Sequence, residues 1–230
     1  MLQVVIPLYG DYEEKYAPVL TALKEMDVKV VPVVDRNGEG FTKTVNKGIR
    51  EVLGNDSFPD FIWVLNQDAV PLPGSDTALI AFMEAHPKCG IVASMQVHPD
   101  DEDFITYGGS GAVIPGNHFT GHISEGQYLE SKQMQWANGA SMLLRVEMLE
   151  EIGLLDENLI NLASDSDLSF RARWAGWEVW YEPKSRVRHT LNFSANPPDK
   201  MKYSAHLDIM RFQGKYQGEM WHELSKEVFD

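Results

Sequence analysis

The sequence contains very little cysteine. Cys89 is the only one among 230 residues. A single thiol cannot form an intrachain disulfide, and it cannot supply the several thiolates of a cysteine-based zinc site. The sequence therefore excludes a disulfide framework and a cysteine-based zinc site, and it agrees with a reducing compartment.

Long apolar runs are also missing. The longest contain about five residues, whereas a helix that spans a bilayer needs roughly 20. The first residues, MLQVVIPLYG, have no basic segment and pass directly into a strand pattern, unlike a secretion signal. Hydrophobic residues make up 43% of the chain, which is typical of a folded protein. We expect a cytoplasmic protein, with peripheral attachment to a membrane as the alternative.

Basic residues are scarce compared with acidic ones. The chain has 20 Lys and Arg residues against 34 Asp and Glu residues, which gives a formal net charge of −14. Such a surface repels phosphodiester backbones and anionic lipids. A non-specific nucleic-acid partner is therefore disfavoured, although a modified nucleic-acid base stays open as a substrate. The charge could equally serve solubility alone.

Strand and helix patterns alternate through the first hundred residues. Apolar spacing predicts strands at 2–9, 28–34, 61–65 and 90–97, and helices at 13–26, 41–54 and 75–86. The repeated β-α-β order predicts a parallel, doubly wound sheet. Ligands of such sheets bind beyond the carboxyl ends of the strands. The residues to consider first are therefore 7–10, 35–40 and 66–68.

The pattern changes after residue 98. Residues 99–135 are rich in Gly, Asp and Ser, and they predict a loop or a small antiparallel excursion without a helix. Helices are predicted again at 145–153, where Gly153 ends the first, and at 164–177, followed by short strands at 178–183 and 186–189. We expect the remaining residues, 196–230, to form a helical extension.

Asp35, Asn37 and Gly38 follow the second predicted strand. A carboxylate there can accept hydrogen bonds from a nucleoside, and glycines allow the backbone to approach a ligand. Asn-Gly and Gly-x-Gly are also strong turn formers, and a simple turn is the favoured alternative. The chain has no GxGxxG motif, so the dinucleotide-binding fingerprint is absent.

Asn66 and Asp68 form an N-x-D sequence at the end of the third predicted strand. Mg²⁺ or Mn²⁺ suits such oxygen ligands, and Mg²⁺ often uses one or two carboxylates together with phosphate oxygens. The alternative is an Asx turn that leads into Pro71. His189, after the last predicted strand, could bind a metal or phosphate, although a lone histidine is more often structural. Trp136 could stack on a sugar ring or be buried.

Ser164, Asp165 and Asp167 open the predicted helix 164–177. Ser164 and Asp167 fit the S-x-x-D capping box, and acidic residues in a first turn suit the helix dipole. Asp165 in the same turn could also act as a general base toward an incoming hydroxyl group. Both interpretations can hold together.

The ordered set of these segments resembles the family 2 glycosyltransferases of the GT-A fold, in particular rhamnosyltransferase-like members. The resemblance covers roughly residues 2–195. It rests on VVIPLYG, VVDRNGEGFTKTVNKGI, WVLNQDAVPLPG, ANGASMLLRVEMLEEIGLLDE and SDSDLSFRARWAGWEVWYEPKSRVRH, and more faintly on RFQGKYQG near the end. It implies a Rossmann-like α/β domain at 1–195, with a nucleotide-sugar-binding half at 1–98 and an acceptor half at 99–195, before the helical extension at 196–230.

The resemblance also implies an activity, namely inverting transfer from a nucleoside-diphosphate sugar to an acceptor hydroxyl group with Mn²⁺ or Mg²⁺. Asp165 would be the catalytic base, and Asp68 and His189 would serve the metal. The residues implied on the donor side are Pro7, Tyr9, Asp35, Asn37, Asn46, Asn66 and Gln67. Those implied on the acceptor side are Trp136, Asn138, Gly139 and Asp167. The acceptor would be a glycan, a lipid-linked sugar or a small molecule.

Two positions depart from the pattern of the family. Asn66 stands where most members carry the first acid of D-x-D, and Ser164 stands where a Glu precedes the catalytic Asp. These changes favour a second hypothesis, a catalytically silent module that binds nucleotide sugars. A sugar nucleotidyltransferase ranks last, because PLYGDYEEKY contains no Arg and only one Gly.

Overall fold

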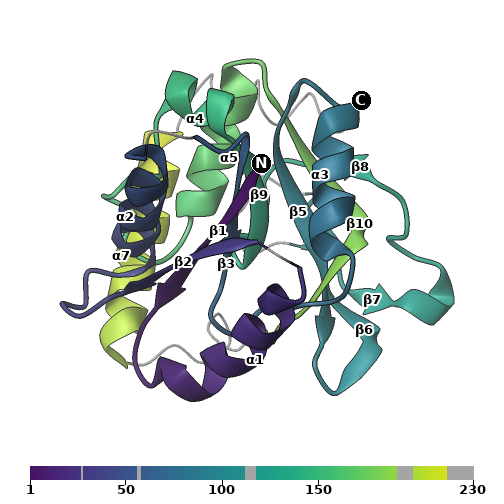
Figure 1. Ribbon diagram of the computed structural model, residues 1–230. Helices are drawn as coiled ribbons and strands as arrows, with labels where there is room; N and C mark the ends of the chain where they lie inside the picture. The colour runs from purple at the N-terminus through teal and green to yellow at the C-terminus, as the bar shows by residue number, and fades with distance from the viewer. Residues whose placement is uncertain (27, 56–57, 112–117, 191–198, 217–230) are drawn as a thin grey trace.

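A mostly parallel sheet forms the centre of the computed structural model, which describes residues 1–26, 28–55, 58–111, 118–190 and 199–216 (Figure 1). The strands are β1 (Leu2–Leu8), β2 (Lys29–Val34), β3 (Phe61–Leu65), β4 (Val70–Pro71), β5 (Cys89–His98), β6 (Asp101–Tyr107), β7 (Gly121–His122), β8 (Lys132–Gln133), β9 (Ser141–Arg145) and β10 (Glu178–Arg188). The helices are α1 (Tyr12–Lys24), α2 (Phe41–Leu53), α3 (Ser75–Ala85), the 3-10 helix η1 (Ile123–Glu125), α4 (Val146–Ile152), α5 (Ser164–Trp174) and α7 (Asp199–Lys215).

The strand order along the sheet is β2-β1-β3-β9-β5-β10-β4. The pairs β1–β2, β1–β3 and β5–β10 are parallel. Strand β9 lies antiparallel between β3 and β5, and β4 lies antiparallel to β10. The predicted mostly parallel α/β fold is confirmed. The prediction missed β9, and the two short strands predicted near residues 178–189 form one long strand, β10.

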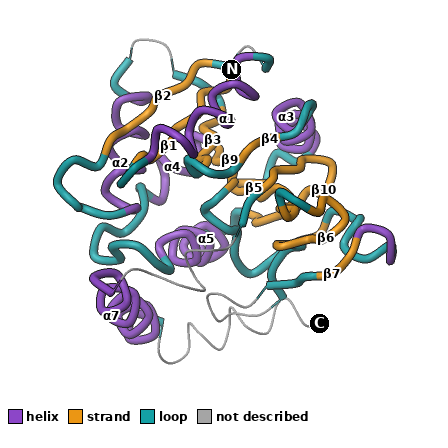
Figure 2. The backbone as a smooth tube through the Cα atoms, turned by 90° about the horizontal axis from the view of Figure 1, so that it is seen from below, coloured by secondary structure: helices purple, strands orange, loops and turns teal. Residues whose placement is uncertain are grey.

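Helices cover both faces of the sheet, as the view from below shows (Figure 2). On one face, α1 and α3 pack against a cluster that includes Val19, Leu79 and Trp63. On the other face, α2, α4, α5 and α7 share a second cluster that includes Ile49 and Phe170. Alternate residues of the central strands enter the two clusters, and this explains why the strands are apolar on both sides.

Gly48 allows α2 to approach the sheet closely. A Cβ atom at this position would lie 2.4 Å from Val5 Cγ1 and 3.0 Å from Val33 Cγ2. Those distances are far below van der Waals contact, so any larger residue would push α2 away from β1 and β2. The glycine of the N-x-Gly-Ile segment is thus a packing requirement.

The excursion predicted at 99–135 is antiparallel, as expected. Strand β6 pairs with β5, β7 pairs with β6, and β8 pairs with β10. The short helix η1 within it was not predicted. Residues 112–117 lie outside the described residues, as do 191–198 and 217–230, so the helical extension predicted for 196–230 is described only as α7.

Helix α5 begins at Ser164 as predicted, but the predicted capping box is wrong. Its N-cap is Ala163, and the N-cap makes no side-chain hydrogen bond. Asp167 instead bonds Arg171, Lys215 at the end of α7 and Tyr216 just after it. The N–H of Asp167 donates to the Ala163 carbonyl at 2.8 Å, so the backbone itself closes this helical turn.

Helix α7 is fastened to the rest of the domain by a buried carboxylate. Asp208 is 0% exposed and accepts hydrogen bonds from three successive backbone N–H groups, those of residues 160–162, at 2.9, 2.8 and 3.0 Å. Tyr216, Lys215 and Phe212 add contacts with α5. The C-terminal helix therefore holds the segment that leads into α5.

We expect Asp208→Ala to lower the free energy of unfolding by about 3 kcal/mol, because it leaves three backbone N–H groups without their acceptor. Urea unfolding measures this as a lower midpoint at an unchanged m-value. Met210→Ala on the exposed side of the same helix is the control, and it should change stability by less than about 0.5 kcal/mol. Equal effects of the two substitutions would contradict the fastening role.

No helix within the described parts of the chain combines the length and apolar character that a membrane crossing requires.

Candidate functional site

The carboxyl ends of β1, β2 and β3 meet at one edge of the sheet. Gln67 ties two of these ends together, because its Oε1 accepts the N–H of Tyr9 at 2.9 Å and its Nε2 donates to the Tyr9 carbonyl at 3.2 Å. Pro7 is buried within β1 and pairs with Val33 of β2. Of the residues predicted on the donor side, Tyr9, Gln67 and Asn66 therefore lie together. Both polar atoms of the Gln67 side chain are therefore engaged by the Tyr9 backbone.

Asn66 and Asp68 each present a buried oxygen that is not satisfied. Within the described residues, Asn66 Oδ1 and Asp68 Oδ1 have no hydrogen-bond partner. Asp68 Oδ1 lies 3.5 Å from His189 Nε2, which is longer than a good hydrogen bond. Buried acceptors without donors are costly in a folded protein. The Asp68 oxygen and the His189 nitrogen beside it fit a divalent cation that would satisfy them, and Asn66, two residues before Asp68, offers a further unsatisfied oxygen.

The ionisation state of Asp68 suits the binding of a cation. Burial acts to raise the pKa of Asp68, but the contact with His189 and the positive charge of Lys15 outweigh it, so the pKa lies below the ordinary value. The carboxylate therefore stays charged at neutral pH. The same negative charge, together with burial as the larger cause, raises the pKa of Tyr9.

Among the described residues, no three His, Cys, Asp or Glu side chains converge into a metal cluster. A site with one carboxylate and one imidazole would therefore need oxygens from its ligand, as Mg²⁺ sites built with phosphate oxygens do.

Asp165 lies in the first turn of α5 and faces a loop that follows the excursion. Its Oδ2 accepts the N–H of Gly139 at 2.9 Å, and its Oδ1 accepts the N–H of Ser166 at 2.8 Å. Burial raises the pKa of Asp165 above its ordinary value, and these two N–H groups offset only part of that effect. A carboxylate with a raised pKa is a stronger base than a free one, as proton abstraction requires.

Ala163, two residues before Asp165, has a φ of +62°, in the left-handed region that non-glycine residues rarely adopt. Such a conformation costs about 1–2 kcal/mol and persists only where the surroundings fix it. The hydrogen bonds from residues 160–162 to Asp208 provide that constraint. Helix α7 thus contributes to the position of Asp165.

Asp35 organises the loop between β2 and α2. Its carboxylate accepts N–H groups from Asn37, Glu39 and Gly40 at 3.3, 2.9 and 2.9 Å. This is the turn that the sequence favoured as the alternative to ligand binding. Asn37 is exposed on the loop. The structure therefore places both residues at the sheet edge, with the Asp35 carboxylate engaged by its own loop.

The side chain of Asn46 is engaged by the protein itself. It is buried, its Nδ2 donates to the Leu155 carbonyl at 2.9 Å, and its Oδ1 accepts the Leu155 N–H at 3.2 Å. Nδ2 also donates to Glu157 at 3.1 Å. Asn46 therefore pins the segment after α4, and any influence on a nucleoside would pass through that packing.

The residues predicted on the acceptor side separate into two groups. Asn138 and Gly139 lie beside Asp165, and Asn138 Oδ1 accepts the Ala140 N–H at 2.9 Å. Trp136 is only 2% exposed, so the structure favours burial over stacking on a sugar.

Asp167 is 0% exposed and bonds Arg171, Tyr216 and Lys215 at 2.8, 2.7 and 2.6 Å. Two residues along a helix correspond to a rotation of about 200°, so Asp167 points away from Asp165. The prediction that Asp167 lies on the acceptor side is therefore corrected: it joins α5 to α7.

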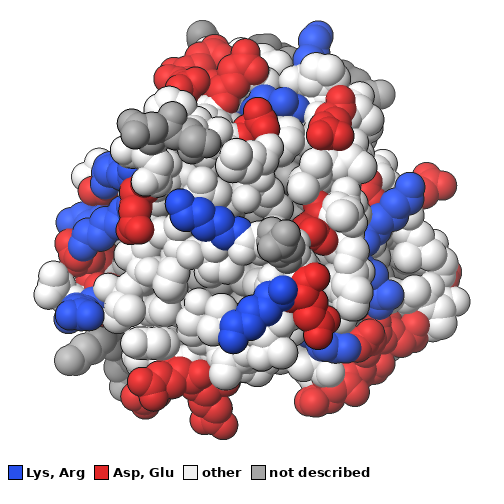
Figure 3. All heavy atoms as spheres, in the orientation of Figure 1, with Lys and Arg blue, Asp and Glu red and all other residues white. Residues whose placement is uncertain are grey.

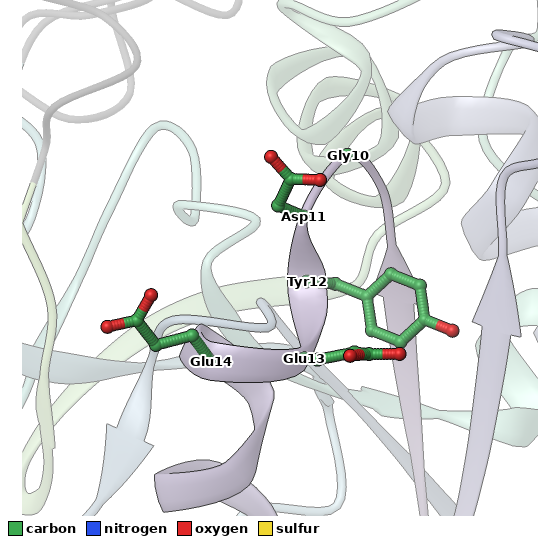
Figure 4. A pocket seen from close by; sticks show the side chains of 5 residues that line it. All are labelled: Gly10, Asp11, Tyr12, Glu13 and Glu14. Atoms are coloured by element: carbon green, nitrogen blue, oxygen red, sulfur yellow. The ribbon is translucent and has the colours of Figure 1, made fainter.

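A hollow of about 390 Å³ lies next to Tyr9 and is lined by residues 10–14 (Figure 4). The side chains of Asp11 and Glu14 point to one side of the chain, and the ring of Tyr12 points to the other. Acidic side chains also gather along the lower edge of the face in Figure 3. The acidic side chains around the hollow would repel a diphosphate unless a cation neutralised the negative charge of the diphosphate.

The sequence-based prediction did not include two residues that lie near the site, Gln96 and Lys15. Gln96, in β5, contacts both His189 and Asn138 at 2.8 and 3.0 Å. Its signal is a fully buried amide within an otherwise apolar strand pattern, GIVASMQV. Lys15 lies close enough to influence Asp68, and it is the single basic residue of PLYGDYEEKY.

Comparison with known proteins identifies the family. Residues 4–208 match the profile of the family described as glycosyltransferase like family 2. A curated relative, the N-acetylglucosaminyl-diphospho-decaprenol L-rhamnosyltransferase of Mycobacterium tuberculosis (strain CDC 1551), is 26% identical over 186 residues. The alignment covers 73% of this chain and 61% of that enzyme, so the chain spans about three fifths of the relative's length.

Solved structures share the fold at low sequence identity. The mannosyltransferase PcManGT from Pyrobaculum calidifontis, in complex with GDP-Man and Mn²⁺, has a TM-score of 0.61 at 12% identity and covers 99% of this chain and 70% of its own. GalNAc-T7 with UDP, GalNAc and Mn²⁺ has a TM-score of 0.58 at 13% identity and covers 82% and 43%. Its family profile, its sheet topology and the fold that it shares with these structures show that the chain belongs to the family described as glycosyltransferase like family 2 and has the GT-A fold.

Proposed function

We propose that this chain transfers a sugar from a nucleoside-diphosphate donor to an acceptor hydroxyl group, with inversion at the anomeric carbon and with a divalent cation. One observation carries the proposal. Two carboxylates of the site have different surroundings: Asp68 has a buried oxygen without a hydrogen-bond partner in the described residues, 3.5 Å from His189, whereas both oxygens of Asp165 accept backbone N–H groups. Such a pair indicates two different chemical tasks.

Asp68 and His189, with Asn66 beside them, would hold Mn²⁺ or Mg²⁺. When bound there, the cation would neutralise negative charge on the diphosphate. The unsatisfied oxygens of Asn66 and Asp68 support this assignment. Lys15 adds a positive charge in the same neighbourhood.

Asp165 would act as the general base. As the acceptor oxygen attacks the anomeric carbon, its proton passes to Asp165, and the electron pair of the breaking C–O bond leaves with the diphosphate. A single displacement inverts the anomeric centre and requires no covalent enzyme intermediate. The N–H of Gly139 and the first turn of α5 would keep Asp165 aimed at the acceptor.

The name of the mycobacterial relative suggests where to begin with substrates. That enzyme is named for an L-rhamnosyl group and for an acceptor sugar linked through diphosphate to a polyprenol. We propose a lipid-linked sugar as the first acceptor to test, and this would bring a protein without a spanning helix in its described part to a membrane surface.

A thermal-shift screen with UDP-, GDP- and dTDP-linked sugars tests the donor class, with L-rhamnose included among the sugars. We expect one nucleotide family to raise Tm when Mn²⁺ is present and to have a much smaller effect with EDTA. The product formed with the best donor should have the inverted anomeric configuration in its NMR coupling constants. Retention of configuration, or no response to any donor, would contradict the proposal.

A further inference from the structure

Gln96 is the centre of a short hydrogen-bonded chain, His189–Gln96–Asn138, whose two ends lie next to the two carboxylates of the site. It is fully buried near the carboxyl end of β5. Its Oε1 lies 2.8 Å from His189 Nδ1, and its Nε2 donates to Asn138 Oδ1 at 3.0 Å. Beyond His189 lies Asp68, and beyond Asn138 lies Gly139, which holds Asp165.

The direction of every hydrogen bond in this chain follows from one backbone group. The Ala140 N–H can only donate, so Asn138 Oδ1, which receives it at 2.9 Å, is an oxygen and an acceptor. Gln96 must therefore present its NH₂ group to Asn138, which leaves its Oε1 facing His189. Since Oε1 can only accept, His189 must carry a hydrogen on Nδ1.

This arrangement decides what the other nitrogen of His189 can do. With the hydrogen on Nδ1, the neutral ring has a lone pair on Nε2, and this atom lies 3.5 Å from Asp68 Oδ1. Two acceptors face one another, so a proton or a cation has to lie between them. Histidines that bind metals commonly donate their second N–H to a neighbouring acceptor, which fixes the ring and its tautomer.

We infer that Gln96 is a positioning residue: it holds His189 in the Nδ1–H tautomer with Nε2 aimed at the cation site, and it ties His189 to the loop that holds Asp165. The inference rests on the proposed function for the cation and for the role of Asp165. The tautomer itself follows from the hydrogen bonds alone.

The loop at residues 138–140 contacts both sides of the site. Residues 138–140 contribute the Asn138 side chain to Gln96 and the Gly139 N–H to Asp165, while the Ala140 carbonyl accepts the Asn66 N–H at 2.9 Å. A displacement of Gln96 would therefore disturb the cation side and the base side together.

The substitution Gln96→Met tests the inference, because methionine has a similar volume and lacks the amide. We expect Mn²⁺ affinity, measured by electron paramagnetic resonance without any donor or acceptor, to fall by about 10–100-fold. Gln3→Met is the matched control, since Gln3 is also a buried strand glutamine but lies at the opposite end of β1. It should leave Mn²⁺ affinity unchanged.

Kinetics separate positioning from general loosening of the fold. For Gln96→Met we expect saturating Mn²⁺ to restore the KM for the donor but not kcat, because the loop that holds Asp165 stays displaced. Full recovery of kcat, or wild-type Mn²⁺ affinity in the folded variant, would overturn the inference.

A measurement on the unmodified chain covers the case in which Gln96→Met does not fold. Long-range ¹H–¹⁵N NMR of the His189 ring reports which nitrogen carries the hydrogen. In the neutral ring we expect Nδ1–H. The Nε2–H tautomer would overturn the inference, even if the chain binds no Mn²⁺ and the proposed cation role fails separately.

Discussion

Asp165→Asn is expected to abolish most sugar transfer while donor binding survives. General bases contribute roughly 10²–10⁴-fold to a rate, so kcat should fall by about that factor. The amide oxygen of asparagine can still accept the Gly139 N–H, which should preserve the loop. Initial rates of transfer, together with donor affinity by calorimetry, measure the two effects separately.

Asp60→Asn is a suitable control for this experiment. Asp60 is exposed at the amino end of β3, opposite the site, where it pairs with the chain's N-terminal amine. Its substitution should leave kcat unchanged. If Asp165→Asn retains wild-type kcat, another group is the base; if no donor and acceptor pair gives transfer with the wild type, the silent binding module becomes the better hypothesis.

The pH dependence of the wild type provides an independent check on Asp165. Only the ionised carboxylate can take a proton, and burial raises the pKa of Asp165. Transfer at saturating Mn²⁺ should therefore rise with pH along a limb that lies above the ordinary aspartate pKa of about 3.9. The limb should vanish in Asp165→Asn. Full activity down to the ordinary aspartate range would contradict a raised pKa.

Asp68→Asn is expected to remove cation-dependent donor binding. Charge stabilisation by a bound metal is worth several kcal/mol, so kcat/KM should fall by about 10²–10³-fold. EDTA should depress the wild type to a similar level and should have little further effect on the variant. Calorimetric titration of the donor with and without Mn²⁺ measures the binding part directly.

Asp60→Asn is again the control for a general change in charge, because Asp60 is exposed at the amino end of β3, opposite the site. It should bind the donor as the wild type does. Mn²⁺-dependent binding that persists in Asp68→Asn would move the cation away from Asp68, whereas loss in both variants would point to charge alone.

Asn66 departs from the family pattern, and the residues around it in the structure show how a cation site could tolerate the change. An amide replaces the first acid of the family's D-x-D, which removes one charge from the cation site. His189 Nε2 next to Asp68, and Asn66 Oδ1 without a partner in the described residues, would provide two further ligand atoms in the proposed cation site. The sequence identified all three residues, but it could not reveal that His189 lies next to Asp68.

Strand β9 shows why part of the fold escaped prediction. Its sequence, SMLLR, contains no β-branched residue, and Met, Leu and Arg favour helices in isolation. The segment becomes a strand because it fills the space between β3 and β5, with five residue pairs to β3 and three to β5. Tertiary pairing overrode local preference there, and the same strand end places residues 138–140 against Asp165.

Asp165 and Asp167, in one turn of α5, also show what the local sequence leaves open and the tertiary structure decides. Both are acids at a predicted helix start, where the sequence predicted a capping role for Asp167 and a reacting role for Asp165. The folded structure distinguishes them, because Arg171, Lys215 and Tyr216 bond Asp167, whereas Asp165 faces the Gly139 loop.

By itself, the sequence determined the α/β class, the strand ends that carry polar groups and the family, because apolar periodicity and motif order are local properties of the chain. The tertiary structure alone decided which polar groups are already satisfied and which remain available. Asp35, Asn46, Gln67 and Asp167 bond their own protein, whereas Asn66 Oδ1 and Asp68 Oδ1 have no hydrogen-bond partner in the part of the chain that the structure describes. The physical reason is that hydrogen-bond partners come from segments far apart in the chain, and only folding brings these partners together.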